Sequence, residues 1–590
     1  MILQRLAEHY DRIVAEGTAE IAPPGYSMQK VSFCIVLEPD GRLNQFEDLL
    51  QQEGKLNRPR MMILPGQNKP TGQGINPRFL WDNAEYLLGY TTDPTRLERA
   101  RSAFQAFRQA HLDLEEEIAR PAFSAVCAFL RAWSPEMASD HKELETMTNN
   151  FGVFRLAGQM QFVHRQVAPR EADPQQGTAD IAMCLVSGDM GPTARLHEPK
   201  IKGVSGAQTA GALLVSFNAT AFTSYGKEQS FNAPVGASTV FKYANALNHL
   251  LNLPDRRIRL GDATVVYWAD HKTRLEDAFA HLFSGAAAEE PTTKEDQERV
   301  REARLLLSQM REGTQNASIE PDEIDTHFYI LGLSPNASRL SVRIWVEAKA
   351  AEMERRLGEH VQDFDLKGGR DDLPLPVWRI VAATGRAEKD PKGRLKSYDT
   401  DSVSPQLTGD LARSILTGAP YPQSLLATMV RRIRSDGDVG FARVSAIKAC
   451  LVRNSRLRGA PLEVPMELDP NHADIAYRCG RLFALLEKAQ TDSAGGDLNS
   501  TIKDRYFSSA SATPGIVFPR LFRLNGHHLN KLPIGAKIYY ERMMGGIMTA
   551  PFDFPKLLSL ADQGKFIIGY FQQRQELYTS RKDKQSEENE

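Results

Sequence analysis

The last third of the chain most constrains the fold, because its pattern is almost entirely helical from about residue 407 onward. Apolar residues there recur at the spacing that places them on one face of a helix. Successive helices of this kind predict an all-helical bundle at the C-terminal end. We predict helices at 407–417, 421–434, 439–453, 472–490, 501–511, 515–523, 533–548 and 552–578.

The region before this bundle mixes strand-like and helix-like runs. Residues 27–38 are rich in β-branched and aromatic side chains, which predicts a strand, and residues 238–251 predict a helix. Residues 326–346 predict a hairpin-like pair of strands around residues 334–336. Further predictions are two helices within 93–131, strands at 180–188, 211–219 and 263–270, and a loop followed by a helix within 285–320.

These patterns predict an α+β fold in three parts. A mixed α/β region spans residues 1–360, a linker with a basic helical segment spans 361–465, and a helical bundle spans 466–590. Residues 360–405 are rich in Asp, Gly and Pro, which predicts a linker or surface loops there.

Composition excludes several classes of protein. The 590 residues are 42% hydrophobic and 25% charged, which is typical of a globular protein, and no apolar run has the length of a membrane span. The N-terminus has the pattern of an amphipathic helix and lacks the apolar core and cleavage site of a signal peptide. Five scattered cysteines without a C-x-x-C motif disfavour structural zinc and a disulfide framework. We therefore expect a cytoplasmic protein that does not bind a membrane.

The sequence contains none of the common catalytic motifs. Gly66 and Gly72 are one residue too far apart for a P-loop, and Pro77 blocks the helix that should follow. None of the thirteen histidines belongs to an H-E-x-x-H motif, and no G-x-S-x-G motif is present. We predict no catalytic residue, no metal and no cofactor.

One alternative is a Mg²⁺-dependent nuclease that uses Asp322, Glu347 and Lys349. In that arrangement two carboxylates hold Mg²⁺ and the lysine positions the attacking water. The pattern is short, and a chain with 74 acidic residues often contains it by chance.

The segment 61–83, MMILPGQNKPTGQGINPRFLWDN, is the first candidate for binding nucleic acid. It combines glycines with amide side chains and one lysine. Amides hydrogen-bond to base edges, and lysine binds backbone phosphate. An ordinary surface loop that packs against a neighbouring subunit is the alternative. The candidate residues are Gln67, Asn68, Lys69, Thr71, Gln73 and Asn76.

A second candidate is the segment 216–235, in which polar residues cluster around Gly226. Its alternative interpretation is a network of β-turns near the core. The candidate residues are Asn218, Ser224, Tyr225, Lys227, Gln229 and Asn232.

Positive charge must be clustered if this chain binds nucleic acid, because its formal net charge is −2. The largest cluster is 431–458, which has eight Lys or Arg residues against two Asp. It predicts either a surface that faces phosphates or a solvated helix face.

Several longer phrases carry a more specific signal. These phrases resemble the large subunit of the type I-C CRISPR surveillance complex, Cascade. They are residues 185–235, 328–345, 476–490 and 563–578, together with the opening MILQRLAEHYDRI. The resemblance extends from end to end in the same order. It implies a non-catalytic subunit beside the 5′ handle of the CRISPR RNA, in contact with the handle-binding and backbone subunits.

The resemblance also implies what this subunit does. It reads a short protospacer-adjacent motif, TTC-like in this subtype, on double-stranded DNA, helps to open the duplex and stabilises the R-loop. It then recruits a separate helicase-nuclease. RNA pairing supplies the sequence specificity, and protein checks the short motif. A purely structural scaffold is the remaining alternative.

Related large subunits read this motif in the minor groove with a glycine loop, a lysine and a glutamine wedge, which the segment 61–83 would supply here. The C-terminal bundle resembles small subunits that line the DNA path, and such a small subunit is implied to be made from the same reading frame, here from Met466. The expected contacts to the displaced single strand are Arg431, Arg432, Arg434, Arg478, Arg481, Lys503, Arg505, Arg520 and Arg523.

Overall fold

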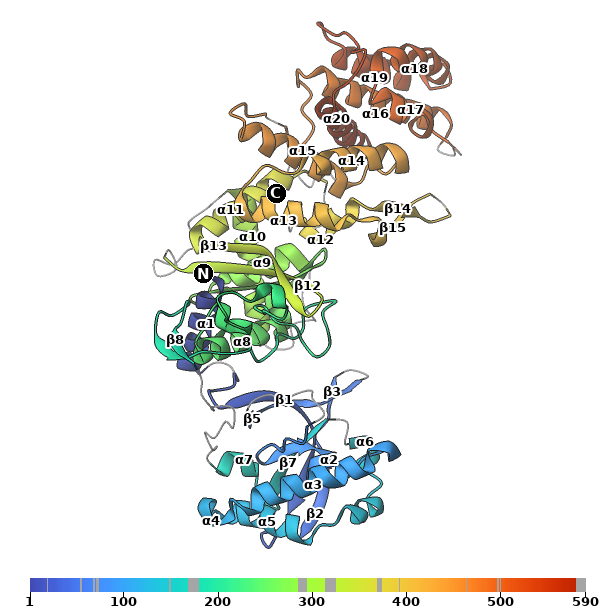
Figure 1. Ribbon diagram of the computed structural model, residues 1–590. Coiled ribbons are helices and arrows are strands. Elements are labelled where there is room, and N and C mark those ends of the chain that lie inside the picture. The colour runs from blue at the N-terminus through green and yellow to red at the C-terminus, as the bar shows by residue number, and fades with distance from the viewer. Residues whose placement is uncertain are drawn as a thin grey trace. The chain divides into compact units, whose positions relative to one another are not determined.

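A computed structural model gives the structure of the chain (Figure 1). It describes residues 1–17, 20–53, 56–66, 69, 74–147, 150–167, 180–284, 294–313, 325–368, 374–391, 393–462, 464–495, 498 and 500–579. The chain forms two compact units. One comprises Met1–Gly203, Ala207–His249 and Ala337–Leu340, and the other comprises Val204–Gly206, Leu250–Asn336 and Ser341–Glu590.

The first unit contains a five-stranded mixed sheet. The strand β1 (Tyr26–Leu37) pairs antiparallel with β2 (Leu43–Asp48) and β5 (Arg60–Pro65), and parallel with β7 (Phe151–Leu156). β6 (Trp81–Asn83) completes the sheet beside β7. The strand predicted at 27–38 is therefore confirmed.

The helices α3 (Leu97–Leu112) and α5 (Pro121–Ala132) pack on this sheet through a buried aromatic cluster. Alternate residues Phe33 and Ile35 of β1 enter the cluster, because successive side chains of a strand point to opposite faces. The first unit also contains α1 (Ile2–Glu16), β3 (Gln51–Glu53), β4 (Leu56–Arg58), α2 (Ala84–Leu87), α4 (Glu115–Ile118), α6 (Leu144–Met147), α7 (Val163–Gln166), β8 (Ile181–Met183), β9 (Met190–Pro192) and α8 (Ala237–Asn252).

A four-stranded sheet begins the second unit, in the order β10-β11-β12-β13. Its strands are β10 (Arg257–Leu260), β11 (Ala263–Ala269), β12 (His327–Asn336) and β13 (Arg339–Lys349). The predicted strand pair at 326–346 is confirmed, although its turn falls after residue 336. The helices α9 (Arg274–Ser284), α10 (Lys294–Glu312) and α11 (Ala350–Phe364) share their core with this sheet.

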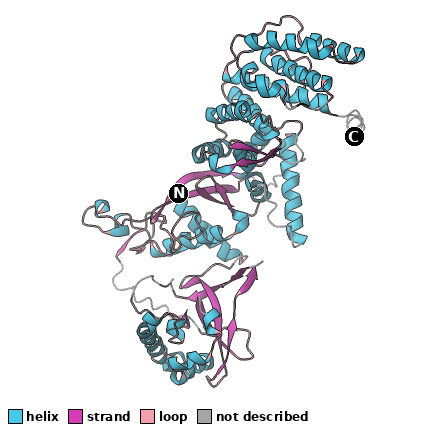
Figure 2. Ribbon diagram, turned by 90° about the vertical axis from the view of Figure 1, so that its right-hand side faces the viewer, coloured by secondary structure: helices cyan, strands magenta, loops and turns pink. Residues whose placement is uncertain are grey.

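The helical C-terminal region is confirmed helix by helix (Figure 2). The largest difference is the last helix, which begins at Leu560 rather than at residue 552. The observed helices are α13 (Pro405–Thr417), α14 (Gln423–Asp436), α15 (Phe441–Arg456), α16 (Ile475–Ser493), α17 (Ile502–Ala510), α18 (Pro514–Leu529), α19 (Ile534–Ile547) and α20 (Leu560–Tyr578).

Two predictions of local structure are wrong. The segment 211–219 forms no strand and makes only isolated bridges, Ile201↔Ala212 and Leu213↔Arg339. Described parts of 360–405 are not merely loops, because they form α12 (Val377–Ala383) and a hairpin of β14 (Arg386–Lys389) and β15 (Leu395–Asp399). Local composition missed this hairpin because residues distant in sequence hold it in place.

The mixed α/β first half and the helical C-terminal end confirm the predicted α+β class. The three-part division at residues 360 and 465 stays a prediction. Within the described residues, no helix combines the length and the apolar character needed to cross a membrane.

Candidate nucleic-acid interface

Only part of the first candidate segment lies within the described residues. Gln67, Asn68, Thr71 and Gln73 lie outside them. Lys69 does not project into solvent: its side chain is 14% exposed, forms an ion pair with Asp82, and lies over the ring of Tyr86 with Nζ 3.2 Å from the ring centroid. Burial lowers the pKa of Lys69 to about 8.

Asp82 holds the far end of the same segment. Its carboxylate is fully buried and also accepts the backbone N–H groups of Arg78 (3.0 Å) and Asn83 (2.8 Å). Asn76 is exposed, and its backbone N–H donates to the Tyr86 hydroxyl at 3.1 Å. Asp82 and Tyr86 therefore fix points before and after Gly72 and Gly74, and the Asn76 side chain is exposed.

The C-terminal end of the segment 61–83 is fixed by the core. Trp81 Nε1 donates to the carbonyl of Pro65 at 2.7 Å, which ties β6 at one end of the segment to β5 at the other. Leu80 adopts φ 61°, and its N–H donates to His111 Nε2 at 2.9 Å. His111 Nδ1 in turn donates to the carbonyl of Phe107 at 2.8 Å. Burial lowers the pKa of His111 to about 4, so the neutral imidazole can accept from Leu80.

The second candidate segment contains a tight turn whose tip is wholly exposed. Ser224 and Lys227 form a bridge, and the N–H of Lys227 donates to the carbonyl of Ser224 at 2.9 Å. Tyr225 and Gly226 between them have φ 50° and 71°. Positive φ at both central residues is the signature of a type I′ hairpin turn. Tyr225 is 100% exposed, although a tyrosine in this backbone region costs about 1 kcal/mol.

Asn232 stabilises this turn from inside. Its Oδ1 accepts the N–H of Ser224, and its Nδ2 donates to the carbonyls of Lys227 and Gln229, each at 2.9 Å. Asn232 therefore holds the turn together, whereas the side chains of Tyr225 and Lys227 are exposed to solvent. Asn218 is exposed as well and donates to Ser338 Oγ at 3.4 Å.

The basic residues predicted to follow the displaced strand divide into two groups. Arg478 and Arg481 are 7% and 5% exposed, and their guanidinium groups donate to backbone carbonyls, among them those of Ile547 (2.9 Å) and Pro470 (2.7 Å). Their role in binding DNA stays a prediction without structural support. The exposed members are Arg431, Arg505, Arg520 and Arg523, whereas Arg432, Arg434 and Lys503 are half-buried.

Two half-buried arginines of α14 make contacts within the protein. Arg432 Nε donates to the carbonyl of Thr384 at 3.1 Å. Arg434 donates to Ser508 Oγ and Gln563 Oε1, each at 3.1 Å, and so links α14 to α17 and α20. Of Arg431, Arg432 and Arg434, Arg431 is therefore the one whose side chain is exposed to solvent.

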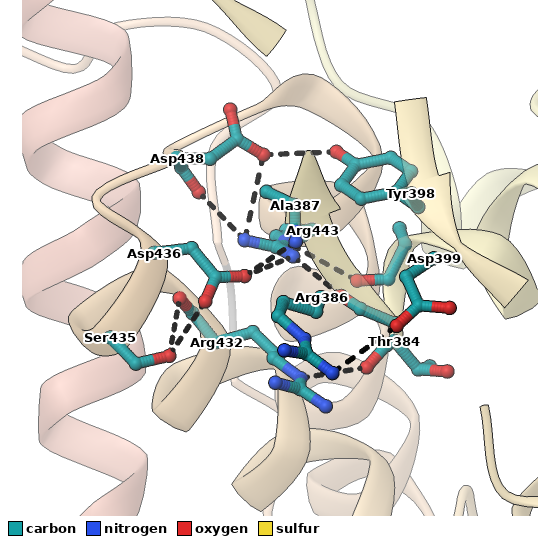
Figure 3. A network of polar contacts seen from close by, with 12 residues as sticks. Thr384, Arg386, Ala387, Tyr398, Asp399, Arg432, Ser435, Asp436, Asp438 and Arg443 are labelled. Carbon is teal, nitrogen blue, oxygen red and sulfur yellow. Dashed lines mark hydrogen bonds and ion pairs between the residues drawn. The ribbon is translucent and has the colours of Figure 1, made fainter. Parts of the chain in front are cut away.

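A buried polar network was not predicted from the sequence (Figure 3). Arg443 is wholly buried and donates to Asp436 Oδ2 (2.8 Å) and to the carbonyls of Gly385 (2.8 Å) and Ala383 (3.0 Å). Its guanidinium lies 4.9 Å from the centroid of the Tyr398 ring. Part of the basic run 431–458 is therefore internal structure, not surface. The signal in the sequence was the pair of aspartates at 436 and 438 just before Arg443.

The residues of the nuclease alternative do not form a metal site within the described structure. Asp322 lies outside the described residues. Glu347 and Lys349 are both exposed on β13, and Lys349 Nζ forms an ion pair with Asp325 Oδ1 at 2.6 Å. In the described part of the chain, no group of three His, Cys, Asp or Glu side chains is placed to hold a metal ion.

Comparison with known proteins gives the class of the molecule. A family model described as a CRISPR-associated protein matches residues 6–578, so this chain is a CRISPR-associated protein. It belongs to the Cas_Csd1 family. No curated protein matches the chain. The family supports the expectation of a Cascade subunit.

Proposed function

We propose that this chain is the large subunit of a type I-C Cascade and reads the protospacer-adjacent motif on double-stranded target DNA. The observation that carries this proposal is the family match over residues 6–578, which covers every candidate segment. The subunit helps to open the duplex, stabilises the R-loop and recruits the helicase-nuclease, without a catalytic residue of its own. Its partners are the CRISPR RNA, target DNA, the handle-binding and backbone subunits, and a small subunit from the same reading frame.

The segment around residues 66–78 is the first part of the proposed motif-reading surface. Asp82 and Tyr86 fix the described residues of this segment. The segment therefore offers a DNA groove a surface whose position is defined. Because Lys69 is paired with Asp82, base contacts fall to the amides, Gln67 and Asn68 above all. Amides suit this role because they both donate and accept hydrogen bonds at base edges.

The Tyr225 turn is the second part of the proposed surface. An aromatic ring at a fixed, solvent-facing tip can stack on a nucleobase, and the neighbouring Lys227 can bind phosphate. The backbone strain at Tyr225 is consistent with a functional constraint, since such strain concentrates at binding sites.

The test uses Cascade assembled with a guide RNA and three versions of this chain: wild type, Gln67→Ala/Asn68→Ala, and Tyr225→Ala/Lys227→Ala. Affinity is measured for matched duplexes with and without the motif, and for a target that is already opened. We expect at least one double variant to lose most of the preference for the motif while it retains affinity for the opened target.

Matched variants separate chemistry from structure. Tyr225→Phe keeps the stacking ring, and Lys227→Arg keeps the charge, so both should retain the wild-type preference. Gln105→Ala removes an exposed amide from α3 and should have no effect. A motif preference that survives in both double variants would remove the reading role from these segments and favour a structural scaffold.

A further inference from the structure

We infer that the β14–β15 hairpin is an arm that binds the sugar–phosphate backbone of DNA. This inference rests on the proposed function but concerns residues outside the motif-reading segments. The hairpin joins α12 to the helical region within the second unit (Figure 1). It carries three exposed cations, Lys389, Arg394 and Lys396.

The acidic groups of the hairpin are engaged inside it. Asp399 pairs with Arg386 at 3.4 Å, Glu388 accepts from Ser397 Oγ at 2.6 Å, and Asp390 accepts the backbone N–H of Arg394 at 2.8 Å. Within the described structure, no carboxylate lies at ion-pair distance from the side chains of Lys389, Arg394 or Lys396. These cations are therefore available to a phosphate.

The attachment of the hairpin explains how so small a unit holds a defined position. An isolated two-stranded hairpin is marginally stable in water, and this one exposes most of its residues. Asp436 at the end of α14 accepts the N–H of Ala387 (3.0 Å) and pairs with Arg443 (2.8 Å). The Tyr398 hydroxyl donates to Asp438 Oδ2 at 3.0 Å (Figure 3).

The electrostatics of this attachment favour the ionised state. Although burial acts to raise the pKa of Asp436, hydrogen bonds from Ala387, Ser435 and Arg443 keep it below its ordinary value. A buried arginine is costly unless it is paired and hydrogen-bonded, and Arg443 has both kinds of partner. The fold thus uses a buried charge network to place a hairpin that contributes little apolar surface to the core.

The hairpin continues a series of basic elements. α14 contacts both β14 and α17, and α17 contacts α18. Exposed cations occur on each: Arg431 on α14, Arg505 on α17, and Arg520 and Arg523 on α18. The Tyr398 ring is covered by Arg443, so the hairpin offers cations and no free aromatic ring to DNA. Its binding should therefore be independent of sequence and sensitive to salt.

The test compares Arg394→Ala/Lys396→Ala with a control that removes equal charge, Arg301→Ala/Arg304→Ala on the exposed side of α10. Each variant is assembled into Cascade, and the dissociation constant for matched target is measured over a range of salt concentrations. Two lost phosphate contacts should reduce the slope of log K against log salt by about 1.4 for single-stranded DNA or about 1.8 for duplex. The control should match the wild type.

Two DNA substrates identify which strand is bound. One carries the full displaced strand, and the other lacks it but keeps the flanking duplex. A reduced slope with the first substrate alone assigns the arm to the displaced strand, and a reduced slope with both assigns it to the duplex. A hairpin variant that equals the control with both substrates overturns the inference.

The result for the hairpin variant can be distinguished from the result of the motif-preference test of the proposed function. The hairpin variant should keep the wild-type ratio of affinities for motif-bearing and motif-free duplex, because the arm does not read bases. Should the motif-reading variants show no effect, the proposed function would fail while the salt slopes of the hairpin variant remain informative. Thermal melting of each free chain checks that the surface substitutions leave the fold intact.

Discussion

At the scale of single residues, the buried His111 side chain helps to hold the first candidate segment in place. Its Nε2 accepts from Leu80 and its Nδ1 donates to Phe107, so only the neutral ring satisfies both hydrogen bonds. Burial lowers the pKa of His111 from its ordinary value of 6.5 to about 4. The unfolded chain therefore binds the proton first as pH falls, and folding loses stability between pH 6.5 and pH 4.

The prediction for His111 is a pH-dependent loss of stability. At pH 5 the wild type should lose about 2 kcal/mol through this group relative to neutral pH. His111→Gln should lose correspondingly less over the same interval, since glutamine does not titrate. Urea unfolding at pH 7 and pH 5 measures both, and identical pH dependence in the two proteins would contradict this assignment.

Lys69 gives a second prediction at this scale. Lys69→Met should cost roughly 3–5 kcal/mol, because it leaves the fully buried Asp82 carboxylate without its cation. Lys69→Met/Asp82→Asn should cost less than the single substitution, since no unpaired charge remains. Thermal melting of the two variants provides the comparison. A nearly neutral Lys69→Met would mean that the lysine is free in solution.

At the scale of secondary-structure elements, the close approach of α16 and α20 depends on two glycines. A Cβ on Gly480 would lie 1.9 Å from the carbonyl oxygen of Phe566, and one on Gly569 would lie 2.2 Å from that of Tyr477. Backbone atoms cannot rotate away as side chains can. The two helices therefore pack at a distance that only glycine permits.

The corresponding prediction is a contrast between two Gly→Ala substitutions. Gly480→Ala should destabilise the helical region by about 1–3 kcal/mol or more, because the backbones must separate. Gly526→Ala on α18 meets no atom within 4 Å and should stabilise by about 0.5–1 kcal/mol through helix propensity. Chemical unfolding of both variants tests the contrast, which disappears if α16 and α20 are not in close contact.

The buried network predicts a local effect on the β14–β15 hairpin. Arg443→Met should cost roughly 3–5 kcal/mol, because Asp436 and two carbonyls lose their donor. Backbone amides of 386–399 should then exchange hydrogen faster than those of the helices. Arg431→Met, at an exposed position of the same basic run, should stay within about 0.5 kcal/mol of wild type. Equal exchange in both variants would contradict the anchoring role.

The same elements show what local sequence can and cannot predict. The C-terminal helices were predictable because each carries its own periodic pattern, such as Leu482, Leu485 and Leu486 of α16. The β14–β15 hairpin was not, because its position depends on Arg443, which lies far along the chain. The burial of Arg478 and Arg481 was not predictable either, because their guanidinium groups donate to carbonyls that no local pattern reveals.

At the scale of the whole molecule, the family match and the candidate surfaces address different questions. The match over 6–578 establishes a CRISPR-associated chain, and the resemblance seen in the sequence had indicated the same class. The contacts of individual residues are visible only in the structure: the composition of 61–83 suggested a lysine available to phosphate, whereas Lys69 is paired with Asp82. In the second segment, the structure shows that Asn232 hydrogen-bonds within the turn and that the Tyr225 side chain is exposed. The sequence alone could not separate these two residues.

We propose above all that this chain confers motif recognition on Cascade. The most direct measurement is the ratio of affinities for matched duplexes with and without the motif, in complexes assembled with and without the chain. We predict a ratio near one in its absence and a restored preference of at least tenfold, about 1.4 kcal/mol, when purified chain is added back. A preference that persists without the chain would assign motif recognition to another subunit and contradict the account.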